Sequence, residues 1–367
     1  MNSITTHFQR KKRKLMKIKK KQTKVTSSNW ASKLFFGALI FSSVTAWSFE
    51  YQDFEKKVKN PYQVRSLVEK MPRKDIEENL RSFLVAGRPS RLIGSAGHKK
   101  VQDYLEEKLK AANSTNATYK RQEFTLSDAS VSKEKGVNFI WEKKGTTKPE
   151  EVIILMANYD TLLKDPKTGK VILKGEMPGA DNNGSGVSML LSMMEIFNKL
   201  EIPKTVLLVF LDAEEFGAQG SKEFAKSLNE GVKPAGFINL TMLGHDSRTT
   251  DTEKKLNNLK LYTSGTEGDS AFGKLITKLG EREYSSISFK EEKISDGTST
   301  LGFPATAESL WGAGFVGITL TQNRQTDLNP RYMTANDFAE TLNIATYTNV
   351  FKYVTYAVLS WNYDIVK

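Results

Sequence analysis

The sequence predicts an α/β fold, a three-layer sandwich in which a central, mostly parallel mixed sheet carries helices on both faces. Apolar runs rich in β-branched residues alternate with segments of helical periodicity from Arg91 to Leu359, and this alternation is typical of parallel sheets. Two of the runs, Val152–Ala157 and Val206–Leu211, are continuously apolar, as in strands buried on both faces. No internal repeat or linker interrupts the pattern, so residues 91–367 are expected to form one domain.

Apolar spacing and turn residues place the individual elements along the chain. Residues 49–90 are expected to form a helical cover, and residues 161–178, with Asp-Pro and Thr-Gly turn signals, a loop. Helices are expected at residues 62–69, 74–84, 101–112, 187–200, 221–229, 269–279 and 337–359. Strands are expected at residues 119–126, 137–143, 152–157, 206–211, 236–240, 259–263 and 315–321.

The positive charge of the chain is concentrated at its amino end. The formal net charge is +12, but residues 1–33 hold eleven Lys and Arg and no acidic residue. The remainder carries 43 basic and 42 acidic residues. Because the folded part is nearly neutral, the sequence predicts no nucleic-acid-binding face.

An apolar run of thirteen residues, Leu34–Ala46, follows the basic segment. This length is short for a membrane span and typical of a signal peptide, and small residues near Ala46 suit cleavage. Residues 1–48 are therefore expected to direct export to the periplasm or the medium, with Met16 as a second candidate start. An uncleaved membrane anchor is the alternative. The chain has no cysteine, which excludes disulfides and cysteine-ligated zinc.

Acidic residues occupy two loops next to predicted elements. Asp181 lies in Gly-Ala-Asp-Asn-Asn-Gly, whose glycines permit a close backbone approach, and Glu214 and Glu215 follow the strand that ends at Leu211. Open α/β sheets carry their chemistry in loops at the carboxyl ends of strands. A carboxylate beside a metal-bound water can take its proton. The three acids therefore predict a metal or acid–base site.

Seven segments carry a family resemblance in the same order along the chain. They are RLIGSAGHKKVQDYLEEKL, VNFIWEKKGT, NYD at 158–160, PGADNNGSG, LDAEEFGAQGS, INLTMLG at 238–244 and RYMTANDF at 331–338. From about Arg91 to Asp337 the chain resembles the di-zinc aminopeptidases of metallopeptidase family twenty-eight, such as bacterial leucyl aminopeptidase and aminopeptidase Y, which are relatives of glutaminyl cyclases. The resemblance implies a zinc-exopeptidase fold.

The same resemblance implies two zinc ions held by five side chains. Matched position by position, Asp181 would bridge the two ions and Glu215 would bind one of them. Glu214 would be the general base, and Asp160 would orient the family's first histidine. Three ligand positions are substituted in this chain, and they are Asn158 for His, Thr241 for Asp and Met333 for His.

These substitutions weaken the expected zinc site, because zinc favours imidazole, thiolate and carboxylate ligands. Met333 is expected to fill the vacated volume, and His98 to be a surface residue at a helix end. His245, together with Asp246, is a candidate replacement ligand. An all-oxygen site for Ca²⁺ or Mg²⁺ is the alternative, and its members would be Asn158, Asp181, Glu215 and Thr241.

Three hypotheses of function follow. In the first, the chain is an exported protein with a zinc-aminopeptidase fold, catalytically impaired or inactive, that binds a peptide or a protein through the old active-site cleft. In the second, it is an active metallo-exopeptidase that uses one metal at Asp181 and Glu215, with Glu214 as base. In the third, the fold serves only as a structural or envelope-associated domain. Membrane contact is expected only through the N-terminal segment.

Overall fold

A computed structural model describes residues 58–131, 133–165, 167–228, 234–247, 256–294 and 306–365. The predicted signal peptide at 1–48 and the candidate start at Met16 lie outside these residues, and the predicted helical cover is described from residue 58 onward. None of the described helices is both long and apolar enough to cross a membrane.

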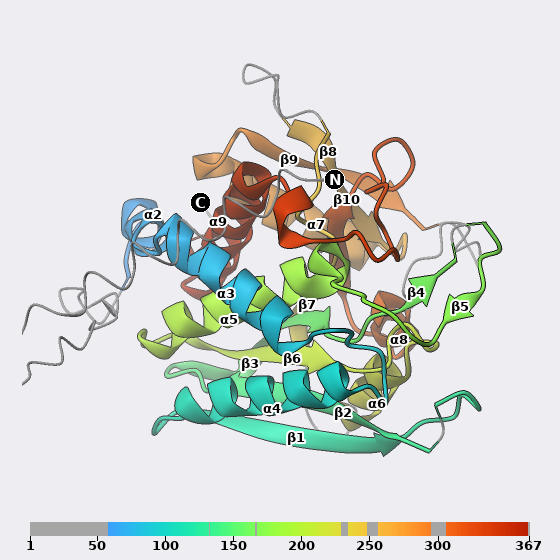
Figure 1. Cartoon of the computed structure of the whole chain (residues 1–367). Coiled ribbons are helices and arrows are strands. Elements are labelled where there is room, and N and C mark those ends of the chain that lie inside the picture. Colours follow the sequence, from blue (N-terminus) through green and yellow to red (C-terminus); the bar gives the residue numbers. More distant parts are fainter. Residues whose placement is uncertain are drawn as a thin grey trace, which may run out of the picture. The chain divides into compact units, whose positions relative to one another are not determined.

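The centre of the fold is an eight-stranded sheet with the order β1-β2-β6-β3-β7-β10-β8-β9 (Figure 1). The four strands β6, β3, β7 and β10 are parallel to one another, whereas β1, β2 and β8 pair antiparallel with their neighbours toward the middle. This is the mixed, mostly parallel sheet that the sequence predicts. The sheet strands are β1 (Ala117–Thr125), β2 (Lys135–Lys143), β3 (Lys148–Asn158), β6 (Lys204–Leu211), β7 (Pro234–Leu240), β8 (Leu256–Thr263), β9 (Ile287–Lys293) and β10 (Gly317–Gln322).

Helices cover both faces of the sheet, as the sequence predicts (Figure 1). One face packs against α2 (Pro61–Glu69), α3 (Arg73–Ala86), α4 (Ala96–Ala111), α5 (Ser185–Asn198), α7 (Glu267–Glu283) and α9 (Ile344–Asn362). The other face packs against α6 (Gln219–Leu228) and α8 (Thr306–Gly312). The three layers explain why β3 and β6 contain the continuous apolar runs Val152–Ala157 and Val206–Leu211.

Strand β3 illustrates that rule. Ile153 and Leu155 belong to the larger core under α3, α5 and α9, whereas Ile154 and Met156 belong to the smaller core under α6 and α8. All four side chains are fully buried. A strand whose alternate side chains enter two different cores has to be apolar throughout.

Five elements differ from the sequence prediction. Strand β9 and helix α8 were not predicted, because β9 is an edge strand with partly exposed charged residues and α8 has only seven residues. The predicted loop 161–178 contains a small hairpin, β4 (Leu163–Lys164) with β5 (Val171–Ile172). The closing helix begins at Ile344 and not at residue 337, because the Asn343 side chain accepts a hydrogen bond from the Thr346 amide and starts the helix there.

The parallel strands β3, β6, β7 and β10 bring their carboxyl ends to one edge of the sheet. The loops after these strands therefore begin close together in space, although they are far apart in the sequence. The turn Ala180–Gly184 joins them at the start of α5.

Helix α4 approaches the loop before it so closely that its second residue has to be glycine. A Cβ atom on Gly97 would lie 2.2 Å from the carbonyl oxygen of Ser90 and 2.3 Å from that of Gly87. These contacts are with main-chain atoms, which cannot rotate away. The contact fixes the loop that carries Arg91, a residue central to the site described below.

We expect Gly97→Ala to lower the free energy of unfolding by about 1–3 kcal/mol, since the added methyl overpacks a backbone contact. Gly312→Ala is the matched control, because a Cβ on Gly312 would have no neighbour within 4 Å. Urea unfolding followed by far-UV circular dichroism measures both. Equal stability of the two variants would show that the contact at Gly97 is looser than described.

Candidate active site

The predicted site residues lie together at the carboxyl edge of the sheet. The Asn158 amide donates to a carboxylate oxygen of Asp160 at 3.2 Å, and the other Asp160 oxygen accepts the Glu215 main-chain N–H at 3.0 Å. The Glu215 carboxylate accepts from the Asn182 amide at 2.8 Å. One chain of hydrogen bonds therefore links the ends of β3 and β6 to the turn that carries Asp181.

Arg91 holds this turn against the end of β3. Its guanidinium is buried and donates to the carbonyl oxygens of Tyr159 at 2.7 Å, Pro178 at 2.5 Å and Gly179 at 2.9 Å. Burial lowers the pKa of Arg91 to about 10, against the opposite effect of nearby carboxylates. Arg91 remains a cation at neutral pH. It is the first residue of the motif RLIGSAGHKKVQDYLEEKL.

Asp337 fixes the turn from its other side. Its carboxylate accepts the main-chain N–H groups of Asp181 at 3.0 Å and of Asn182 at 3.1 Å, and its carbonyl oxygen accepts that of Ala180. Burial, followed by the charge of Asp181, raises the pKa of Asp337 to about 7. The sequence did not predict a role for Asp337 beyond its place in the family motif.

The carboxylate of Asp181 is fully buried and accepts three hydrogen bonds. One oxygen accepts the Gly244 main-chain N–H at 2.8 Å, and the other accepts the side-chain amides of Asn329 at 3.0 Å and Gln322 at 3.2 Å. Burial raises the pKa of Asp181, whereas the hydrogen bonds from Asn329, Gly244 and Gln322 and the charge of His245 lower it. Neutral donors thus surround the group that the resemblance places between two cations.

Asp160 and Glu215 form a second pair of interacting acids in the site. Burial raises the pKa of both carboxyl groups, and the charge of Glu215 raises that of Asp160 further. The hydrogen bond from Asn182 and the positive charges of Lys164, Arg324 and Arg91 oppose the rise at Glu215. Cationic side chains therefore provide part of the positive charge that balances these acids.

Glu214 faces α6 and α8. Its carboxylate accepts the Ser221 main-chain N–H at 2.6 Å, the Ser221 hydroxyl at 3.0 Å and the Thr306 hydroxyl at 2.5 Å. Burial raises the pKa of Glu214 to about 7, although these hydrogen bonds favour its ionised form. The role of Glu214 as a general base stays a prediction.

The three substituted positions differ in their surroundings: Asn158 is hydrogen-bonded, Thr241 has a buried hydroxyl without a partner among the described residues, and Met333 packs against apolar side chains. The Asn158 side-chain oxygen accepts from the Asn183 amide at 3.0 Å. The Thr241 hydroxyl is buried and has no hydrogen-bond partner among the described residues. Met333 is partly buried and packs against Leu92 and its apolar neighbours Leu162, Leu163 and Met177, in agreement with the expectation that it fills space.

His98 is not the surface residue that the sequence predicted. It is buried, its Nε2 atom lies 2.9 Å from a carboxylate oxygen of Asp212, and its ring stacks on Tyr159 at 5.6 Å. The prediction failed because Ser95 caps α4 before His98, so that the histidine lies in the first turn on the face turned to the sheet. His98 and Asp212 form a buried pair behind the β6 end.

His245 pairs with an acid outside the predicted ligand set. Its Nε2 atom lies 3.4 Å from a carboxylate oxygen of Asp327, and Asp246 accepts from the Thr346 hydroxyl at 3.3 Å. Among the described residues, no three His, Asp or Glu side chains are grouped so as to hold a metal ion.

Sequence reasoning missed the amide side chains that surround the acids. Gln322 is the last residue of β10 and Asn329 lies in the loop after it, at the same sheet edge as the predicted acids, but neither belongs to a charged motif. Asn182 and Asn183 were noted only as turn residues. Their position could have indicated these four residues, because each lies at or near the end of a strand or the start of a helix at the site.

Comparison with known protein families assigns the chain to one of them. The family model described as Peptidase family M28 matches residues 138–358, which is more than half of the chain. The chain belongs to peptidase family M28. This confirms the resemblance on which the residue matching rests, while the individual ligand positions stay predictions.

Two curated proteins are similar to parts of the chain. A probable zinc metalloprotease of Pyrenophora tritici-repentis is 29% identical over 124 residues, which cover 34% of this chain and 27% of that protein. Aminopeptidase YwaD of Bacillus subtilis is 24% identical over 253 residues, covering 68% of this chain and 49% of that protein. The chain therefore spans about half or less of the length of these relatives.

Solved structures share the fold. The glutaminyl cyclase of Bacteroides thetaiotaomicron, bound to N-acetylhistamine, superposes with a TM-score of 0.63 at 19% identity and covers 80% of this chain and 98% of that one. The LapA aminopeptidase of Legionella pneumophila gives a TM-score of 0.61 at 16% identity, with 93% and 80% covered. At these identities the likeness shows the α/β exopeptidase-like fold and nothing finer.

We expect Asn329→Ala to lower the free energy of unfolding by about 1–3 kcal/mol, because it removes a donor from the buried Asp181 carboxylate. Asn336→Ala is the matched control, since Asn336 is an exposed asparagine nearby whose described hydrogen bonds use its main chain. Chemical unfolding at pH 7 compares the two variants. If both lose the same stability, the Asn329–Asp181 contact contributes nothing specific.

The raised pKa of Glu214 predicts how the stability of the fold changes with pH. Its carboxyl pKa is raised from 4.5 to about 7 in the fold, so the folded state binds more protons than the unfolded state between these values. Stability contributed by Glu214 is therefore complete below about pH 4.5 and is lost as the pH rises through about 7.

We expect Glu214→Gln to be more stable relative to the wild type at pH 8 than at pH 5, because glutamine does not ionise and can still accept the Ser221 N–H. Unfolding in urea across this pH range measures the difference. Glu107→Gln, at an exposed position on α4, is the control and should show no such trend. A pH-independent difference for Glu214→Gln would contradict the raised pKa.

Proposed function

We propose that this chain is a non-catalytic or severely impaired member of family M28 that binds a peptide in the cleft at the carboxyl edge of the sheet. The observation that carries the proposal is the hydrogen bonding of Asp181. Its carboxylate would have to bridge two zinc ions, yet it accepts three N–H donors from Gly244, Asn329 and Gln322.

The chemistry of these donors argues against a zinc pair. An ionised carboxylate has about four lone-pair sites, and metal ions and N–H groups compete for them. With three sites occupied by donors, two cations could bind only if Asn329, Gln322 and the Gly244 main chain moved away. The donors satisfy the carboxylate without a metal.

The other ligand positions do not fit zinc either. The Asn158 oxygen already accepts from Asn183, Thr241 offers a neutral hydroxyl, and Met333 packs in an apolar cluster. Zinc sites in proteins use imidazole, thiolate and carboxylate groups. The all-oxygen site for Ca²⁺ or Mg²⁺ meets the same obstacle at Asp181, since hard cations depend on carboxylate oxygens.

A cleft suited to peptide lies beside the altered site. A pocket of about 420 Å³ has Glu215 and Asp128 as its charged lining residues and Leu162, Val171 and Phe216 among its apolar ones. Acidic groups attract an amino group, and apolar walls accept a side chain. We therefore propose a peptide, free or part of a protein, as the ligand.

An active metallo-exopeptidase is the second candidate. It would use one metal at Asp181 and Glu215, with Glu214 as base, and the observation in its favour is the Glu214 pKa of about 7. A general base is most effective when its pKa lies near the working pH. The three hydrogen bonds that occupy the Glu214 carboxylate weigh against this role.

The place of action is also part of the proposal. The basic segment and the apolar run Leu34–Ala46 have the composition of a signal peptide. We propose that the protein is exported, periplasmic or secreted, with anchoring through the same segment as the alternative.

We expect the purified chain to contain no stoichiometric zinc and to hydrolyse aminoacyl anilides no faster than a Glu214→Gln variant. Its melting temperature should not change on adding zinc or a chelator, because only a ligand that binds the native state shifts that temperature. Elemental analysis, an anilide assay and thermal unfolding give the three readouts. Stoichiometric zinc with chelator-sensitive turnover that Glu214→Gln abolishes would establish the second candidate instead.

A variant with restored ligands provides the positive control. Asn158→His, Thr241→Asp and Met333→His together should gain zinc and a zinc-dependent rise in melting temperature, since they return imidazole and carboxylate ligands. A triple variant that folds and remains free of metal, both as it stands and with Gln322→Ala and Asn329→Ala added to free the Asp181 carboxylate, would show that the matched positions are wrong.

A further inference from the structure

The pocket beside Glu215 continues into a second pocket. The second one has a volume of about 440 Å³ and is formed by the loop before α4, the loop between β1 and β2, and the chain after β5. Both pockets are lined by Ser130 and Leu173. Because Ser130 and Leu173 line both pockets, the two pockets are adjacent, and an extended ligand that passes over these two side chains reaches both; the two pockets are called the compartments of one groove below.

The first compartment is acidic. Its charged lining residues are Glu215 and Asp128, and both are carboxylates. One Glu215 oxygen accepts the Asn182 amide, and the Asp128 carboxylate accepts the main-chain N–H and hydroxyl of Ser130. Lys164, Arg324 and Arg91 offset part of the charge of Glu215, but none of them lines the compartment, so a positively charged group fits this end of the groove.

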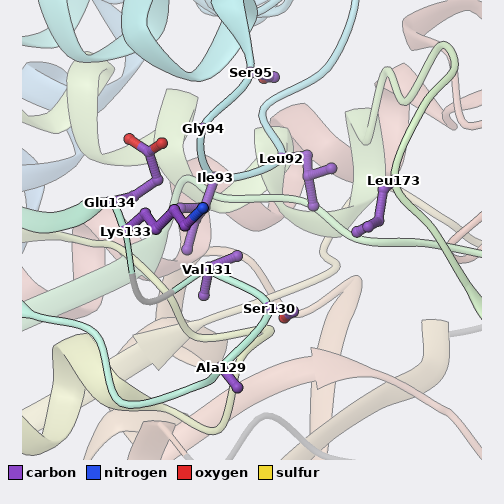
Figure 2. Close-up of a pocket in the computed structure, with 10 residues that line it drawn as sticks. All are labelled: Leu92, Ile93, Gly94, Ser95, Ala129, Ser130, Val131, Lys133, Glu134 and Leu173. Carbon is purple, nitrogen blue, oxygen red and sulfur yellow. The ribbon is translucent and has the colours of Figure 1, made fainter.

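The second compartment is apolar and electrically balanced. Its aliphatic lining residues are Leu92, Ile93, Val131 and Leu173, and its two charged ones, Lys133 and Glu134, have opposite signs. Figure 2 shows Ile93 and Val131 on one side of the view, and Leu92 and Leu173 on the other. A large uncharged side chain matches these walls better than a charged one.

Exposed apolar surface marks the groove as incomplete without an occupant. Leu173 is 56% exposed and Val171 is 44% exposed, and each lines the groove. By contrast, Leu92, Ile93 and Val131 are buried. Apolar side chains that stay exposed beside a pocket are typical of binding sites, and a ligand lying along the groove would cover both.

We propose that this groove binds an extended peptide whose amino terminus lies at Glu215 and Asp128 and whose large apolar side chain, one or more residues further along, fills the second compartment. The proposal rests on the peptide-binding function given above and adds a specificity determinant to it. The second compartment selects the peptide through a residue that is not its first.

The test uses fluorescent tetrapeptides with the full chain. One leucine is moved through positions one to four of an alanine peptide, and each peptide is measured with a free and with an acetylated amino terminus. We expect leucine at one position after the first to bind about tenfold more tightly than alanine, as burial of a leucine side chain allows. Acetylation should weaken every peptide, because it removes the charge that Glu215 attracts.

Two variants assign the effect to the second compartment. Leu173→Ser removes its exposed wall, and Ala129→Phe fills it from an exposed position. Both should abolish the preference for leucine and leave the effect of acetylation in place. Val316→Ser is the control, because Val316 is similarly apolar and 37% exposed but precedes β10, at the opposite edge of the sheet; it should bind like the wild type.

The outcomes separate the two proposals. Binding of no peptide would overturn the proposed function itself. Peptide binding that depends on the free amino terminus, with the leucine preference unchanged in Leu173→Ser and Ala129→Phe, would overturn only the second compartment. A leucine preference that is lost in Leu173→Ser but unchanged in Ala129→Phe would also contradict the proposal, because Ala129 lines the second compartment alone, whereas Leu173 lines both.

Discussion

The buried guanidinium of Arg91 is the interaction on which the site depends. It joins three carbonyl oxygens from two separate segments, the end of β3 and the turn before α5. Its positive charge also interacts with the carboxyl groups of Asp337, Asp160 and Glu215. A charge buried in this way is stable only when its partners are fixed, so the same contacts that satisfy Arg91 define the position of the acids.

The acids would repel one another without that framework. Their carboxyl pKa values are raised chiefly by burial, and neutral donors hold them in place: Asn182 for Glu215, and Asn329 with Gln322 for Asp181. Amide groups carry no charge, so they lower the energy of an ionised acid less than a metal would. The cost is limited because Arg91, Lys164 and Arg324 add positive charge at Glu215.

The sequence predicts the fold well, because burial on both faces of a strand imposes a continuous apolar run that can be recognised locally. It also predicts that Asp181 and Glu215 lie together, since strand order decides where loops meet. It could not predict the two side-chain donors to Asp181, because Gln322 and Asn329 lie 141 and 148 positions away in the sequence. The burial of His98 was missed because the helix was expected to begin only at Val101; α4 begins at Ala96, and His98 then lies on the same buried face as Val101 and Leu105.

The three donors on Asp181 also bear on the descent of the site. Two of the donors are the side chains of Gln322 and Asn329. The third is the main-chain N–H of Gly244, which is retained when Gly244 is replaced by any residue that has a main-chain N–H. Restoring one of the three ligands at Asn158, Thr241 and Met333 would leave the other two substituted and the donors on Asp181 in place. Return to a zinc centre therefore requires several substitutions, and metal binding would favour none of them until the others are present.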